Sequence, residues 1–250
     1  MTNPSLPSHT AQTSLATPES HGPRHRALAS FRYLDLLTSA FVAILLVSNL
    51  VAQKVCLIGG FAISGAILLF PVTYIFGDIF TEVYGFAASR RAIWIGFFAT
   101  LLLYGVSAIT IALPSAPGWQ NQQAFATVFG FIPRLLAASL VAFWAGEFAN
   151  SYVMARMKLL TEGRALWSRT IGSTVIGQAV DTTLVITLTF VGTVSAATLL
   201  NMIGTGYVLK VAYEVLATPL TYLVINALKR AEHSDPLDRT ESFNPFAFLG

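Results

Sequence analysis

The stretch FPVTYIFGDIFTEVYG, residues 70–85, places two carboxylates inside a long apolar tract. Asp78 and Glu82 are four residues apart, so they share one face if the stretch is helical. An Asp at the centre of a membrane-spanning helix costs about 2.5–3.5 kcal/mol, and such residues face a bundle interior or a cavity. The stretch therefore predicts a helix with a functional polar face inside the protein.

The composition around this stretch is typical of a membrane protein. The chain has 250 residues, of which 54% are hydrophobic and 11% charged, and its mean hydropathy is +0.65. A soluble domain carries about 25% charged residues. A spanning helix needs about 20 apolar residues, whereas strands of a membrane barrel are about 10 residues long and alternate in polarity. We expect an all-α polytopic membrane protein with six transmembrane helices, at residues 33–53, 61–84, 92–113, 127–155, 170–191 and 197–228.

The distribution of basic residues predicts the orientation. Lysine and arginine stay mainly on the cytoplasmic side of a membrane. Of the 15 basic residues, 12 lie before the first segment, after the last segment, or in the second and fourth connections. Only Lys54 lies in the other connections, and Arg134 and Lys210 lie within apolar segments. We expect both termini in the cytoplasm, with a disordered tail at residues 1–30, a six-helix transmembrane domain at 31–230 and a second tail at 231–250.

Several functional classes lack the residues they need. The single cysteine, Cys56, excludes an internal disulfide and a Cys-rich metal site. Neither a G-x-x-x-x-G-K-[ST] nor an H-E-x-x-H motif is present, and all four histidines lie in the predicted tails. We therefore expect no enzyme, no catalytic residue, no metal site and no nucleic-acid partner.

Polar and ionisable side chains within the apolar segments are the candidate substrate-binding residues. They are Asn49, Tyr74, Asp78, Glu82, Arg134, Gln178, Asp181, Lys210 and Glu214. Tyr74 and Asp78 are four residues apart, so one helix face offers both a ring and a hydrogen-bond acceptor. A flat heterocycle with N–H donors needs that combination, because its ring stacks while a carboxylate accepts the donors.

A structural role is open for some of these residues. Lys210 and Glu214 have the spacing at which two charges on one helix neutralise each other. Glu82 is near enough to the interface to pair with Arg90 or Arg91. The side chain of Arg134 is long enough to extend to the outer surface, and Glu147 lies near enough to the cytoplasmic boundary to be interfacial. Asp78 and Asp181 have no nearby basic residue in their own segments.

Six short motifs occur in the order and placement of a known family. They are Ser48-Asn49, the residues 70–85 pattern FP-x-TY-x-x-x-D-x-x-TE-VYG, Arg90-Arg91, Arg134, the GQ-x-x-D at 177–181 and the LK-VAYE-VLATPLTY at 209–222. Together they resemble the queuosine precursor transporter family, also called the vitamin uptake transporter family, over residues 48–228.

The resemblance implies a multi-pass protein of the bacterial inner membrane that imports 7-deazapurine bases. These are queuosine precursors such as the cyano- and aminomethyl-deazaguanines (preQ0 and preQ1), or queuine, bound near the midplane of the bilayer. Import is either facilitated diffusion or proton-coupled through Asp78 or Asp181, with no cofactor. An alternative is a substrate-binding membrane subunit of an ATP-driven importer. The sequence leaves a monomer and a homodimer open.

Overall fold

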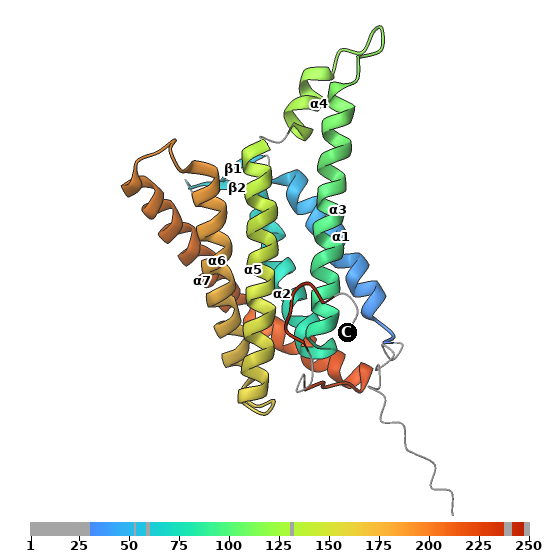
Figure 1. Ribbon diagram of the computed structural model, residues 1–250, viewed down its shortest axis with the longest axis vertical. Helices are drawn as coiled ribbons and strands as arrows, with labels where there is room; N and C mark the ends of the chain where they lie inside the picture. Colours follow the sequence, from blue (N-terminus) through green and yellow to red (C-terminus); the bar gives the residue numbers. More distant parts are fainter. Residues whose placement is uncertain (1–30, 53, 59–60, 131–132, 238–241, 248–250) are drawn as a thin grey trace, which may run out of the picture. The chain divides into compact units, whose positions relative to one another are not determined.

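The chain folds into a helical bundle with one short hairpin. The computed structural model describes residues 31–52, 54–58, 61–130, 133–237 and 242–247 (Figure 1). In this part of the chain, 5 helices are long and apolar enough to cross a membrane. They are α1 (Leu34–Val51), α3 (Phe86–Ala112), α5 (Pro133–Leu160), α6 (Leu166–Phe190) and α7 (Ala196–Glu232). The third candidate span, Gln122–Leu160, includes the short helix α4 (Gln122–Phe129) as well as α5. The predicted all-α membrane fold is confirmed, whereas six spans and two cytoplasmic termini stay predictions.

The second predicted span, residues 61–84, is not one continuous helix. An antiparallel hairpin of β1 (Val55–Ile58) and β2 (Phe61–Ser64) comes first, followed by the 3-10 turn η1 (Gly65–Leu68). Then come α2 (Phe70–Ile79) and the π-helical turn η2 (Phe80–Tyr84). The 10 residues of α2 and the 5 of η2 rise only about 22 Å, less than the bilayer core of about 30 Å.

Proline and glycine fix the two ends of this short helix. Pro71 lies in the first turn of α2, where its missing N–H removes no helical hydrogen bond. Gly85, with φ of +87°, separates η2 from α3, and this backbone conformation is open to glycine but strained for other residues. The chain therefore turns back at Gly85 without a longer loop.

Two pairs of helices bring the polar side chains of the interior together. α5 packs along α6, and α6 packs against α7, while α2 contacts both α5 and α7 (Figure 1). Between α5 and α6 the backbones approach closely at Gly146 and Gly177. A Cβ on Gly146 would lie 2.7 Å from the Cβ of Asp181, and one on Gly177 would lie 2.8 Å from the Cβ of Asn150. Small residues are what allow such close packing in membrane helices.

Aromatic side chains join α1 to α2. Phe41 of α1 is 1% exposed and lies in an edge-on contact with Phe80, 5.7 Å between ring centroids. Phe76, one turn earlier on α2, lies 6.0 Å from Phe41. Edge-on and tilted ring pairs add about 0.5–1.5 kcal/mol to the area they bury. They hold α1 against the face of α2 that does not carry Asp78.

The C-terminal part of the chain packs back on the bundle. Glu232, at the end of α7, accepts hydrogen bonds from the backbone N–H of Tyr33 at 2.7 Å and from the Tyr84 hydroxyl at 2.9 Å. Beyond α7, Arg90 and Trp94 of α3 donate to backbone carbonyls of residues 242–245 at 2.9 Å. Part of the predicted C-terminal tail therefore lies on α3.

We expect Gly146→Ala to destabilise the protein. The added methyl group would overlap Asp181 and the backbone of α6, and overpacking of this kind costs about 1–3 kcal/mol. A fall in melting temperature of about 5 °C in detergent follows from about 2–4 °C per kcal/mol for a chain of this size. The matched control is Gly204→Ala on α7, where nothing lies within 4 Å of the added Cβ. Equal melting temperatures for the two variants would contradict the close α5–α6 contact.

Candidate functional site

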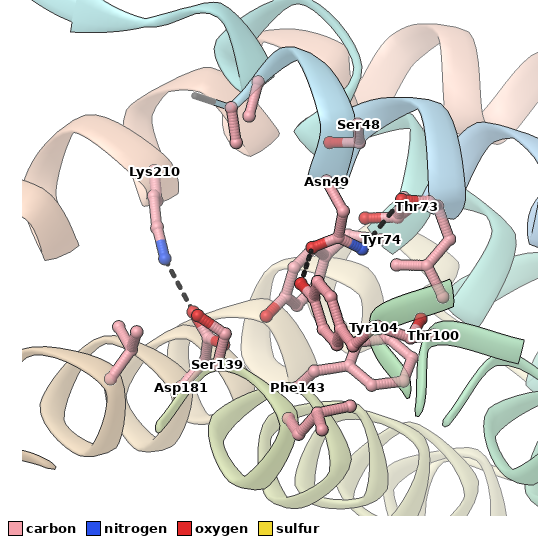
Figure 2. A pocket seen from close by; sticks show the side chains of 15 residues that line it. Ser48, Asn49, Thr73, Tyr74, Thr100, Tyr104, Ser139, Phe143, Asp181 and Lys210 are labelled. Atoms are coloured by element: carbon pink, nitrogen blue, oxygen red, sulfur yellow. Dashed lines mark hydrogen bonds and ion pairs between the residues drawn. The ribbon is translucent and has the colours of Figure 1, made fainter. Parts of the chain in front are cut away.

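A cavity of about 190 Å³ lies between the helices, and side chains from α1, α2, α3, α5, α6 and α7 line it (Figure 2). Its walls carry several hydroxyl, amide and charged groups. These are Ser48, Asn49, Thr73, Tyr74, Thr100, Tyr104, Ser139, Asp181 and Lys210. A cavity of about 150 Å³ accepts a benzene ring. The volume is therefore of the size that a small ring system needs.

An ion pair between α6 and α7 borders the cavity. The Lys210 ammonium lies 2.6 Å from Asp181 Oδ2, and the two side chains are 26% and 10% exposed (Figure 2). The alternative in which Lys210 pairs with Glu214 on its own helix is wrong, because the ammonium reaches across to α6. The pair presents one acceptor and one donor side by side to whatever occupies the cavity.

The opposite side of the cavity carries neutral polar groups and rings. The Tyr104 hydroxyl donates to Asn49 Oδ1 at 3.1 Å, and the Asn49 amide donates to the Leu45 carbonyl at 2.9 Å (Figure 2). Tyr74 and Phe143 add aromatic surface. Four predicted residues from four different helices, Asn49, Tyr74, Asp181 and Lys210, thus line one cavity.

A layer of buried carboxylates lies one helical turn farther along α2, α5 and α7. This carboxylate layer consists of Asp78, Glu147 and Glu214, which are 0%, 1% and 3% exposed. Each stands four residues after a residue that lines the cavity, namely Tyr74, Phe143 and Lys210. Gln178 of α6, 1% exposed, carries an amide without a hydrogen-bond partner among the described residues, as do oxygens of all three carboxyls. Asp78, Gln178 and Glu214 are therefore interior, and none of them lines the cavity.

An ion cluster surrounds Glu82 still farther along the same helices. Arg169 binds both Glu82 carboxylate oxygens, at 2.7 and 3.3 Å, and Lys229 lies 2.5 Å from Oε1. Lys158 donates to the Glu82 carbonyl at 2.8 Å. Asp235 then pairs with Lys158 at 2.7 Å and with Lys229 at 2.8 Å. This ion cluster joins η2, α5, α6, α7 and the segment after α7.

The position of Glu82 favours a structural role. Its side chain is 0% exposed and is not among the residues that line the cavity. The alternative in which it pairs with Arg90 or Arg91 is wrong, since its partners are Arg169, Lys158 and Lys229. That Glu82 binds substrate stays a prediction, without support from its position.

Arg134 lies away from the cavity, at the start of α5. Its guanidinium donates to the carbonyls of Leu188 at 2.7 Å and Val191 at 2.6 Å, at the end of α6. A cationic side chain often satisfies the last carbonyls of a helix in this way. A substrate role for Arg134 is therefore also without support from its position.

Three buried residues of the interior were not among the predicted site residues. Lys158 and Arg169 were expected in a cytoplasmic connection, and for Glu147 an interfacial position was left open; their exposed fractions are 1%, 0% and 1%. The signal that locates them is the unbroken length of α5 and α6, which carry all three inside the bundle. Positive charge near the end of a segment is ambiguous, because it marks either a loop or a buried partner for a carboxylate.

Comparison with known proteins assigns the chain to a family. The family described as "Putative vitamin uptake transporter" matches residues 64–224, which include most of the cavity wall. The chain belongs to this family. The "Probable queuosine precursor transporter" of Bacillus subtilis (strain 168) is 28% identical over 188 residues, 75% of this chain and 82% of that protein. The "Queuosine precursor transporter" of Escherichia coli (strain K12) is 25% identical over 152 residues, 61% of this chain and 66% of that protein. No solved structure is significantly similar to the chain.

Membership in the vitamin uptake transporter family confirms the resemblance found in the sequence. Together with the long apolar helices, it makes the chain a multi-pass membrane transporter of the bacterial inner membrane. A transporter needs a solute site reachable between its helices, and the cavity beside Asp181 and Lys210 is a candidate for it.

We expect Glu82→Gln to destabilise the transporter strongly. The variant leaves Arg169, 0% exposed, without its charge partner, and breaking a buried ion pair on one side costs about 3–5 kcal/mol. The melting temperature in detergent should fall by about 10 °C. The control is Asp235→Asn in the same ion cluster, where the side chain is 56% exposed and surface pairs contribute about 0–1 kcal/mol. A smaller effect for Glu82→Gln than for Asp235→Asn would contradict this role.

The stabilisation that Asp235 provides should depend on pH in one direction. Partial burial acts to raise the pKa of the Asp235 carboxyl, but hydrogen bonds from Lys158 and Lys229 outweigh burial and lower this pKa. Because the folded pKa lies below the unfolded value of about 3.9, the contribution is complete above that pH and is lost as the pH falls through the lowered pKa. The melting-temperature difference between wild type and Asp235→Asn should be constant from pH 5 to 8, begin to shrink below about pH 4 and disappear as the pH falls through the lowered pKa.

Proposed function

We propose that the chain imports queuosine precursors, that is 7-deazaguanine bases, and that the cavity beside Asp181 and Lys210 binds them. Two relatives carry the name queuosine precursor transporter, one of them with the word probable, and their alignments cover 75% and 61% of the chain. The observation that carries the proposal is the pairing of an acceptor with a donor, Asp181 with Lys210, on a cavity that also has aromatic walls.

The chemistry of a deazaguanine matches this wall. One edge of the base presents a ring N–H and an exocyclic amino group next to a carbonyl oxygen. A carboxylate such as Asp181 accepts from the donors, and an ammonium such as that of Lys210 donates to the carbonyl. The base would thus exchange the direct ion pair for charge-assisted hydrogen bonds to both of its members.

Aromatic side chains supply the contact to the flat faces of the base. Tyr74 and Phe143 line the cavity from α2 and α5, and Tyr104 and Asn49 border it from α3 and α1. Stacking of a base on an aromatic ring contributes about 1–3 kcal/mol. Asp78, Gln178 and Glu214 lie in the next layer of the interior and would contact the solute only if the helices rearrange during transport.

The transport assay uses purified protein in liposomes. Vesicles loaded with unlabelled cyano-7-deazaguanine should take up the labelled base by exchange, without ATP and without any partner protein. The alternative, a subunit of an ATP-driven importer, predicts no exchange until its partners and ATP are added. The names of the relatives lend that alternative no support.

We expect Asp181→Asn to lower the exchange rate about 10-fold or more at low solute concentration. Loss of a charge-assisted hydrogen bond costs about 1.5–3 kcal/mol, and 1.4 kcal/mol corresponds to a factor of 10 in affinity. The matched control is Asp35→Asn, an exposed carboxylate in the first turn of α1. If Asp181→Asn exchanges the base as fast as Asp35→Asn at equal protein level, the cavity is not the binding site.

A further inference from the structure

The carboxylate layer carries acid groups without basic partners. None of the ion pairs that the described residues form involves Asp78, Glu147 or Glu214. The cations of the interior are instead engaged on either side of the layer, by Asp181 in the cavity and by the ion cluster. Carboxylates that lack a partner within a membrane protein are a mark of ion or proton pathways.

Glu147 is the least satisfied member of this layer. Neither of its carboxyl oxygens has a hydrogen-bond partner among the described residues. Asp78, in contrast, accepts a hydrogen bond from the Asn150 amide at 3.1 Å. Asp181, near the same site, is paired with Lys210. Of the Glu214 carboxyl, only Oε1 is buried without a partner among the described residues. Glu147 is therefore the member of the layer with both carboxyl oxygens in this condition.

The surroundings of Glu147 hold further unsatisfied polar atoms. Gln178 is 1% exposed, and both atoms of its amide lack a hydrogen-bond partner among the described residues. Asn150 is 0% exposed, and its carbonyl oxygen has no such partner either. A buried amide in this condition costs about 1–3 kcal/mol. Buried groups that stay unsatisfied at this cost call for a functional explanation.

We propose that Glu147 is the proton-binding site that couples solute import to the proton gradient. A proton adds to one carboxylate oxygen of Glu147 and makes the neutral acid, and its release restores the carboxylate. No other bond changes, and the net charge of the layer changes by one. The titratable groups that face Glu147 are Tyr74 and Asp78 from α2, Asp181 from α6 and Glu214 from α7. The ammonium of Lys210, also on α7, is held by Asp181.

The packing of α2 on α5 explains how a proton would act on the helices. A Cβ on Gly77 of α2 would lie 2.7 Å from Glu147 Oε2, so the helix backbone passes directly over the carboxyl. An ionised Glu147 repels Asp78 on α2 and Glu214 on α7, and the neutral acid does not. Binding of the proton therefore favours this close packing, and release favours separation of α2 from α5.

The test compares exchange of the solute with its accumulation in liposomes. The proposal rests on the proposed function, because the assay uses the solute that it names. Wild type and Glu147→Gln are reconstituted, with the membrane potential clamped, and given the neutral cyano-7-deazaguanine. Exchange requires no net proton movement, whereas accumulation against a gradient does. With one proton per solute, a pH gradient of one unit should give wild type about a 10-fold accumulation.

We expect Glu147→Gln to exchange the solute and to lose the whole 10-fold accumulation. Glu162→Gln, an exposed position in the turn after α5, is the control and should accumulate like wild type. The proposal is overturned if wild type exchanges but does not accumulate, or if Glu147→Gln still accumulates. It is also overturned if folded Glu147→Gln no longer exchanges, because the residue would then hold solute. Absence of exchange in wild type would instead contradict the proposed function.

If Glu147→Gln does not fold, a labelling measurement on the wild-type protein still tests the proposal. A hydrophobic carbodiimide reacts with protonated carboxyls in apolar surroundings, and mass spectrometry locates the modified residue. We expect Glu147 to be labelled, at a rate that falls as the pH is raised. Labelling of Asp78 or Glu214 in its place, or labelling of Glu147 that does not change with pH, would overturn the proposal.

Discussion

A carboxylate inside an apolar bundle has to be compensated, because an ionised group without a partner is among the most costly to bury. The described residues bury five of them, and they are met in three ways. Glu82 is fully neutralised by the ion cluster. Asp181 pairs with one cation, Lys210, and both side chains line the cavity. Asp78, Glu147 and Glu214 take part in none of the ion pairs that the described residues form. The buried carboxylates are therefore compensated unevenly.

The same constraint acts on the backbone. Every N–H and C=O at membrane depth must be satisfied, and irregular backbone is tolerated only inside the protein or around a cavity. The irregular parts of this fold are the β1–β2 hairpin, η1 and η2, and all five residues of η2 are buried. The π-helical turn η2 contains Glu82. Such turns occur often at functional sites, and this one directs a carboxylate toward three cations.

The sequence was sufficient for the parts of the fold that depend on length and hydropathy. It predicted an all-α membrane protein, and α1, α3, α6 and α7 lie close to their predicted ranges. It failed at residues 61–69, because an apolar run has the same hydropathy as a helix or as a hairpin. For the site, the spacing of Asp78 and Glu82 on one face was informative, but the two residues fulfil different roles. Which cation reaches which carboxylate depends on packing between distant helices, and no local pattern records that Arg169 meets Glu82.

The order of the three levels along the helices has an energetic consequence. The cavity and the carboxylate layer are one turn apart, about 5.4 Å along a helix. A charge on Glu147 repels Asp181, which the packing at Gly146 brings close, and attracts Lys210, so its effects on the two members of the ion pair oppose each other. The ion cluster lies a further turn away, and its basic groups already offset Glu82. A change of charge at Glu147 therefore alters how strongly Asp181 and Lys210 hold each other, whereas the charge of Glu82 is offset by its own three cations. Because coupling between two binding sites is reciprocal, a proton on Glu147 that changes the affinity for the solute by some factor implies that the solute changes the proton affinity of Glu147 by the same factor.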